Sequence, residues 1–220
     1  MDDSPFFTIH GLSSIALFFL LSSFVVSCTS KPVPSTQTIT AYSTSSAQPW
    51  MNELFACADE LSVSVEVTAE DPDIFLRIGE PETLLSPAYQ IDEEEILIVT
   101  YRESPVQNLL LEEAQALFSG SSGESVQVWV YPSELDVQGL FDQFVMQGRS
   151  VTSSARVAVN PQQMSDLLNS ESNSVGILSR HWKAGNIREV YSLGVFPVLA
   201  ILKEEPQSAA ASVLMCLQNN

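Results

Sequence analysis

The sequence predicts an α/β fold, because strand-like and helix-like segments alternate along most of its 220 residues. The run ILIVTY at residues 96–101 is continuously apolar, as in a strand that is covered on both sides. After residues 43–46, apolar side chains instead recur at helical spacing from Trp50 to Leu61, which predicts a helix of about 13 residues with one buried face. A folded core is therefore expected.

The remaining elements follow in a regular order. We expect strands at residues 38–42, 62–68, within 72–78, 96–101, 126–130, 156–159, 174–179 and 195–202. After the first helix, further helices are expected at residues 111–118, 136–147, from Pro161 onward, and 206–218. Gly120 and Gly148 stand where helices commonly end in a left-handed residue.

Composition excludes several classes of protein. The chain has 27 acidic and 9 basic residues, a formal net charge of −18. Nucleic-acid binding and docking on anionic lipid both need clustered Lys and Arg, so neither is expected. The acidic run at residues 92–95 (DEEE) is interpreted as a solvated loop rather than a metal site, because consecutive side chains point in different directions.

The first 27 residues are predicted to be a signal peptide. The apolar run at residues 12–27 has the length of a signal-peptide core rather than of a membrane span. Its end, Val25 to Cys28, resembles the lipobox of bacterial lipoproteins, which implies that Cys28 is lipidated and that residues 28–37 form the anchored tether. The alternative is an uncleaved membrane helix, which the acidic start at Asp2 and Asp3 favours.

The sequence lacks the common catalytic and cofactor-binding motifs. Without the signal peptide only one histidine is left, His181, so a histidine metal cluster cannot form. Nucleophile-elbow, dinucleotide-binding and phosphate-loop patterns do not occur. A Ser–His–Asp arrangement through His181 stays open, because its members can be distant in sequence. We expect no enzyme, no cofactor and no metal.

Residues 101–120 (YRESPVQNLLLEEAQALFSG) resemble the crossover segment of phosphate-type periplasmic substrate-binding proteins. The positions that match are Asn108, Leu109, Leu111, Leu117, Phe118 and Gly120. Residues 174–178 and 196–198 are similar to later segments of that family. The resemblance covers residues 38–218 and is clearest over 96–218.

The resemblance implies a two-lobed α/β fold of the type II periplasmic-binding kind, each lobe a small mixed sheet flanked by helices. Lobe 1 would comprise residues 38–100 and 190–220, and lobe 2 residues 101–189. A ligand would bind between the lobes, at the carboxyl ends of strands and the N-termini of helices.

In that family the segment corresponding to residues 43–46 hydrogen-bonds an anionic ligand, so Ser43, Thr44, Ser45 and Ser46 are candidate ligand-binding residues. Arg77, at the end of a predicted strand, and Ser133, just before the helix expected at residue 136, are further candidates. An ordinary N-cap is the alternative for residues 43–46, and a surface salt bridge for Arg77. The segment 131–137 (YPSELDV) lacks the family's Arg and its Ser-Gly-Thr cluster. Its acids, Glu134 and Asp136, would repel phosphate, so inorganic phosphate is not expected to bind.

Cys57 and Cys216 lie on the apolar sides of their helices, and in the family the terminal helix returns to the first lobe. A disulfide between them is therefore a candidate in an oxidising compartment. Two separate buried cysteines are the alternative.

These observations predict a monomeric, extracytoplasmic protein, held by a lipidated cysteine at the outer face of the cell membrane or in the periplasm. It would deliver a small ligand, with anions among the candidates, to the permease of an ABC transporter. The alternative is a non-transport lipoprotein that uses a degenerate binding-protein fold for interaction or sensing.

Overall fold

The computed structural model describes residues 37–123 and 125–219. The predicted signal peptide and Cys28 lie outside these residues. Within the part that is described, no helix is both long and apolar enough to cross a membrane.

Eight strands form one mixed sheet in the order β2-β1-β3-β8-β4-β7-β5-β6. The strands are β1 (Thr38–Ser43), β2 (Ser64–Val67), β3 (Ile74–Ile78), β4 (Ala88–Tyr101), β5 (Gln127–Val130), β6 (Arg156–Val157), β7 (Ser174–Ser179) and β8 (Ile187–Leu202). The two long strands, β4 and β8, are antiparallel neighbours from Ala88↔Ile201 to Tyr101↔Ile187. They form the centre of the sheet.

The helices are α1 (Gln48–Glu60), α2 (Leu111–Ser119), α3 (Asp136–Phe141), α4 (Pro161–Ser170) and α5 (Ser208–Leu217). A π-helical turn, η1 (Asp142–Met146), continues α3, and a 3-10 turn, η2 (Arg180–Trp182), follows β7. Gly120 adopts the predicted left-handed conformation (φ 77°) after α2. The helical stretch from Asp136 ends at Gln147, which is already left-handed (φ 50°), one residue before the predicted Gly148.

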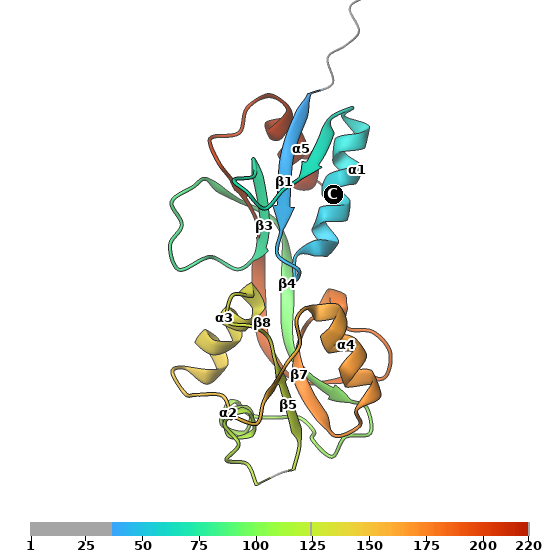
Figure 1. Cartoon of the computed structure of the whole chain (residues 1–220), viewed down its shortest axis with the longest axis vertical. Coiled ribbons are helices and arrows are strands. Elements are labelled where there is room, and N and C mark those ends of the chain that lie inside the picture. The colour runs from blue at the N-terminus through green and yellow to red at the C-terminus, as the bar shows by residue number, and fades with distance from the viewer. Residues whose placement is uncertain (1–36, 124, 220) are drawn as a thin grey trace, which may run out of the picture. The chain divides into compact units, whose positions relative to one another are not determined.

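Two groups of elements lie at the two ends of β4 and β8 (Figure 1). The terminal group comprises β1, β2, β3, α1 and α5, and its β3 pairs with residues 198–202 of β8. The central group comprises α2, β5, α3, η1, β6, α4, β7 and η2, and its β7 pairs with residues 96–100 of β4. The predicted α/β class is confirmed. The two expected small sheets are joined into one, because β4 and β8 belong to both.

The acidic run at residues 92–95 is not a solvated loop, and that interpretation is wrong. These residues lie within β4 and pair with Val195–Val198 of β8. Because side chains alternate along a strand, Glu93 is exposed whereas Glu94 is buried (2% exposed). Pairing with a partner strand about a hundred residues away outweighs the local polarity of the sequence.

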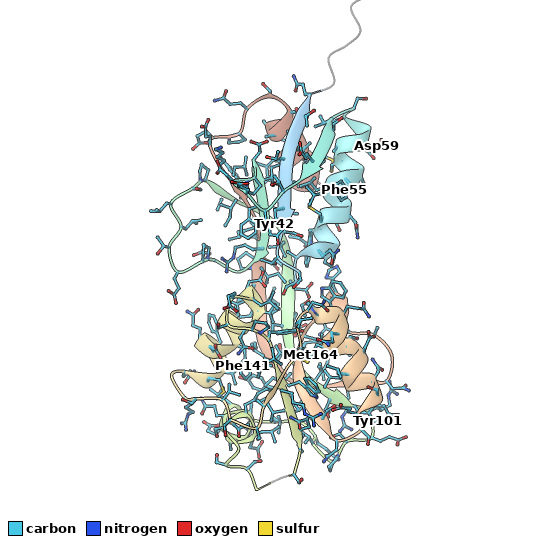
Figure 2. All side chains as sticks on the ribbon, in the orientation of Figure 1. Tyr42, Phe55, Asp59, Tyr101, Phe141 and Met164 are labelled. Atoms are coloured by element: carbon cyan, nitrogen blue, oxygen red, sulfur yellow. A yellow bond between two sulfur atoms is a disulfide. The ribbon has the colours of Figure 1, made fainter. Side chains whose placement is uncertain are left out.

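Apolar side chains pack the helices of each group against the sheet. In the terminal group, α1 buries Trp50, Leu54 and Cys57, and the structure joins Cys57 to Cys216 of α5 by a disulfide with Cα atoms 5.8 Å apart. In the central group, Figure 2 labels two core residues, Phe141 on α3 and Met164 on α4. A Cβ at Gly176 of β7 would lie 2.5 Å from the Met164 sulfur, so the helix can pack this closely only on glycine.

Candidate functional site

A cleft of about 920 Å³ is lined by residues of both groups. One wall is the end of β3 and the loop after it, from Arg77 to Glu82. The opposite wall is the segment from Ser133 to Phe144, which contains α3 and the start of η1. Phe196 and Pro197 of β8 complete the lining. The cleft thus lies where the terminal and central groups meet.

Asp136, the first residue of α3, links the two walls. One of its carboxylate oxygens, Oδ2, accepts a hydrogen bond from the Thr44 hydroxyl (2.7 Å) and another from the backbone N–H of Ile78 (2.8 Å). The other oxygen, Oδ1, accepts from the N–H of Val137 at 2.9 Å. The residue is only 5% exposed. A buried carboxylate with three donors is well compensated even without a direct ion pair.

Thr44 reaches this carboxylate because it directly follows β1. Its own N–H donates to the carbonyl of Leu76 in the neighbouring strand β3, at 3.0 Å. Its hydroxyl also accepts from the N–H of Ala47, at 3.2 Å, before α1 begins. The parallel pairing of β1 with β3 therefore places the Thr44 hydroxyl beside the Ile78 N–H at the carboxyl ends of both strands.

Arg77, on β3, is the single basic residue in the cleft lining. Its Nε is buried and has no hydrogen-bond partner among the described residues. Burial lowers the pKa of Arg77, because it removes water from the guanidinium, and the charge of Asp136 partly opposes this effect. Arg77 and Asp136 therefore attract each other electrostatically, although no hydrogen bond or ion pair joins them among the described residues.

Negative charge dominates the cleft. Five acidic side chains line it: Glu80, Glu82, Glu134, Asp136 and Asp142. Burial raises the pKa of Asp142, although a hydrogen bond from the Gln138 amide (2.9 Å) acts in the opposite direction. An additional anion would be repelled by five of the six charged residues that line the cleft.

Two aromatic rings supply an apolar part of the wall. Phe144 and Phe196 pack edge to face with ring centroids 5.0 Å apart. Phe144 is 43% exposed, whereas Phe196 is 8% exposed. Such a partly exposed pair offers an apolar and aromatic surface to a ligand.

The structure brings some of the predicted binding residues together. Arg77 and Ser133 line the cleft, on opposite walls. Thr44 reaches it through its hydrogen bond to Asp136. Ser43, Ser45 and Ser46 are not among the lining residues, and Ser46 is fully buried, with its carbonyl accepting from the Trp182 indole.

Sequence reasoning missed three features of the site. Asp136 was visible only as an acid near a helix start, because its partners Thr44 and Ile78 are 92 and 58 residues away. Phe144 falls within the predicted helix at residues 136–147 and Phe196 within the family-like segment 196–198, and nothing local in the sequence indicates that they meet at a cleft. Within the described residues, no group of three or more His, Cys, Asp or Glu side chains could hold a metal ion.

No family model matches the sequence, and no curated protein matches it either. Solved structures do match. A putative phosphate ABC transporter substrate-binding protein from Clostridium perfringens, with bound phosphate, has a TM-score of 0.73 at 15% identity, covering 82% of this chain and 93% of that one. An ABC-type phosphate transport receptor from Vibrio cholerae has a TM-score of 0.63 at 14% identity, over 83% and 93%.

A regulatory domain is also similar: the CcmR regulatory domain of Synechocystis, in complex with 2-PG, has a TM-score of 0.62 at 13% identity, over 84% of this chain and 97% of that one. At such identities the likeness establishes the fold alone. The expected two-lobed, type II periplasmic-binding fold is confirmed, and the neighbours are binding and regulatory domains.

Proposed function

We propose that this chain is an extracytoplasmic solute-binding protein that holds a small molecule between lobe 1 (residues 38–100 and 190–220) and lobe 2 (residues 101–189). The observation that carries the proposal is the cleft of about 920 Å³ with walls from both groups. A lipidated Cys28 would anchor the protein outside the membrane, and the tether would let it reach the permease of an ABC transporter. Ligand release would follow opening of the lobes.

The lining favours a particular class of ligand. Five acids face one arginine, so a neutral or positively charged molecule is accepted more readily than phosphate or another anion. The Phe144–Phe196 pair favours a ligand with an apolar or aromatic part. A quaternary or protonated amine over an aromatic ring would use both features.

A ligand screen tests this proposal. The purified protein is examined by native mass spectrometry for a co-purified molecule, and by thermal unfolding with choline, betaine, polyamines, basic amino acids and inorganic phosphate. At 100 times its dissociation constant a ligand stabilises the fold by about 2.7 kcal/mol. We expect a shift with at least one cationic compound and none with millimolar phosphate.

Phe144→Ala should raise the dissociation constant of a cationic compound that binds by tenfold or more. Phe55→Ala is the matched control, because Phe55 is similarly exposed (40%) but lies on α1, away from the cleft lining. A phosphate shift in the wild-type protein, or equal effects of the two substitutions, would contradict the proposed ligand class.

Lipid anchoring has its own test. A fatty-acid analogue should label the wild-type protein and not Cys28→Ala, which should be released from membranes or stay unprocessed. Labelling that persists in Cys28→Ala would disprove the anchor without affecting the cleft.

A second candidate is a non-transport module for interaction or sensing. The hydrogen bonds of Asp136 to Thr44 and Ile78 favour it, because they join the two cleft walls without any ligand. This candidate would be preferred if no co-purified molecule is found and no compound in the screen shifts the unfolding temperature.

A further inference from the structure

The groups around the Asp136 carboxylate form a compact anion-binding cradle. The Thr44 hydroxyl and the Ile78 N–H both donate to the same oxygen, at 2.7 and 2.8 Å. Both donors belong to the terminal side of the cleft, and the carboxylate is almost completely buried between them. A hydroxyl and a backbone N–H converging on one point are donors suited to an anionic oxygen.

Arg77 adds positive charge to this cradle. Its guanidinium interacts electrostatically with Asp136, and its buried Nε has no hydrogen-bond partner among the described residues. Burying a cation with a donor unused is unfavourable unless a negative charge stays nearby. A carboxylate at this point therefore meets two hydrogen-bond donors, Thr44 and Ile78, and is also attracted by the charge of Arg77.

That anion comes from the other side of the cleft. Asp136 belongs to α3 of the central group, 92 residues along the chain from Thr44 and 58 from Ile78. Its second oxygen is held by the N–H of Val137, which fixes the direction of the carboxylate. The chain thus supplies its own acceptor across the cleft.

We propose that Asp136 is a tethered anion, which fills the cradle of Thr44, Ile78 and Arg77 in place of a free anion and holds the two cleft walls together. The cradle is therefore closed to phosphate and small carboxylates in the native protein, and it becomes a binding site for them only when this side chain is removed. The proposal does not depend on which molecule occupies the rest of the cleft.

Chemical rescue of Asp136→Ala tests the proposal, with sodium formate as the probe. Alanine keeps the Cβ, so the space that is vacated is that of one carboxylate group, which formate matches. We expect the substitution to lower the melting temperature by about 10 °C, as for loss of one partner of a buried charge. Formate should then raise it by about 5 °C in a saturable way, while chloride at equal ionic strength should not.

Asp142→Ala is the matched control. Asp142 lies on the same helical stretch and in the same cleft, but within the described part of the chain the one hydrogen bond to its carboxylate comes from Gln138 on the same helical stretch. Neither this variant nor the wild-type protein should respond to formate beyond the chloride reference. Equal responses of Asp136→Ala and Asp142→Ala, or saturable formate binding by the wild-type protein, would overturn the proposal.

If Asp136→Ala cannot be obtained folded with or without formate, Asp136→Asn decides the matter. The amide has the shape of the carboxylate but no charge, so its hydrogen bonds from Thr44 and Ile78 should be weaker. Amide hydrogen exchange of the peptide that contains Ile78 should be at least tenfold faster than in Asp142→Asn. Equal exchange in the two variants would show that the charge of Asp136 does not hold the cradle closed.

Discussion

Two buried carboxylates, Asp136 and Glu94, lie where elements of the terminal and central groups meet, and they are compensated in different ways. The donors to Asp136 are a hydroxyl and two backbone N–H groups, all uncharged. Glu94 of β4 accepts from the N–H of Arg180 (2.8 Å) and contacts the ring of His181, whose side chain is 45% exposed. Both carboxylates are buried, so the difference lies in their partners: those of Asp136 are uncharged, whereas Glu94 contacts a titratable ring that is partly exposed.

The environment of Glu94 continues into solvent. Arg180 forms ion pairs with Glu95 and Glu189 at 2.5 and 2.9 Å, and its side chain is 49% exposed. Water and salt can replace part of each interaction made by these exposed partners, whereas the Ile78 N–H that donates to Asp136 is buried. Loss of a donor should therefore cost more at the cleft than at η2.

Apart from removal of the Asp136 carboxylate itself, the largest effect is expected from Thr44→Val. Valine keeps the shape of threonine but removes the hydroxyl that donates to Asp136, leaving a buried charge with one donor fewer. The free energy of unfolding should fall by about 2–3 kcal/mol, measured by urea denaturation. Thr44→Ser keeps the hydroxyl and should cost less than about 1 kcal/mol. Equal losses would show that Thr44 acts through packing.

A smaller effect is expected from Glu94→Gln. The amide retains one acceptor for the Arg180 N–H but loses its charge, and His181 can turn to water instead. We expect a loss of about 1–2 kcal/mol. Glu93→Gln, at the exposed neighbouring position, should change stability by less than about 0.5 kcal/mol. A Glu94→Gln loss that equals or exceeds that of Thr44→Val would remove the distinction between the two junctions.

Trp182→Phe isolates one neutral hydrogen bond near η2. The Trp182 indole donates to the carbonyl of Ser46 at 3.1 Å, joining η2 to the segment between β1 and α1. Phenylalanine keeps an aromatic ring and removes the donor, so a loss of about 1 kcal/mol is expected in the same urea assay. A loss above that of Thr44→Val would mean that ring packing dominates this contact.

The smallest effect on stability is expected for the exposed ion pairs of Arg180 with Glu95 and Glu189, and it depends on pH in the acid range. The pKa of Glu95 is lowered by hydrogen bonds from Ser192 and Arg180, and that of Glu189 by hydrogen bonds from Lys183 and, after opposing desolvation, Arg180. A carboxyl whose folded pKa is lowered stabilises the fold above its unfolded pKa, near 4.5, and loses this contribution as the pH falls through the folded pKa. In Arg180→Gln the free energy of unfolding should therefore depend less steeply on pH below about pH 4.5.

At neutral pH the same substitution should cost less than about 1 kcal/mol, and less still in high salt. Thr44→Val should show no comparable dependence on salt, because its partner is buried. A salt-independent loss in Arg180→Gln would indicate that these ion pairs are not screened as their exposure implies.

Local patterns in the sequence were sufficient for the elements of the core. The helical spacing from Trp50 to Cys57 corresponds to α1, and the run at residues 96–101 to the buried half of β4. The polar half of β4, residues 88–95, was not recognised as a strand, because what stabilises it is pairing with β8. No pattern within a few residues contains that information.

Some residues of the cleft were named from the sequence, and their binding of a ligand stays a prediction. The candidates included Arg77, at the end of a predicted strand, and Ser133, which the structure places on opposite walls of the cleft. The hydrogen bond from Thr44 to Asp136 could not be predicted, because Asp136 stands in a segment that differs from the family's sequence. Long-range hydrogen bonds of single polar side chains leave no periodic signal in a sequence.

The bond between Cys57 and Cys216 has a practical consequence for a damaged molecule. It closes a covalent ring over a sequence separation of 159 residues, which contains the whole central group and both walls of the cleft. Cleavage of one peptide bond anywhere inside the ring leaves both fragments attached. A protease that nicks the exposed segment around Leu85 would thus leave a single band on a non-reducing gel, which divides in two only after reduction.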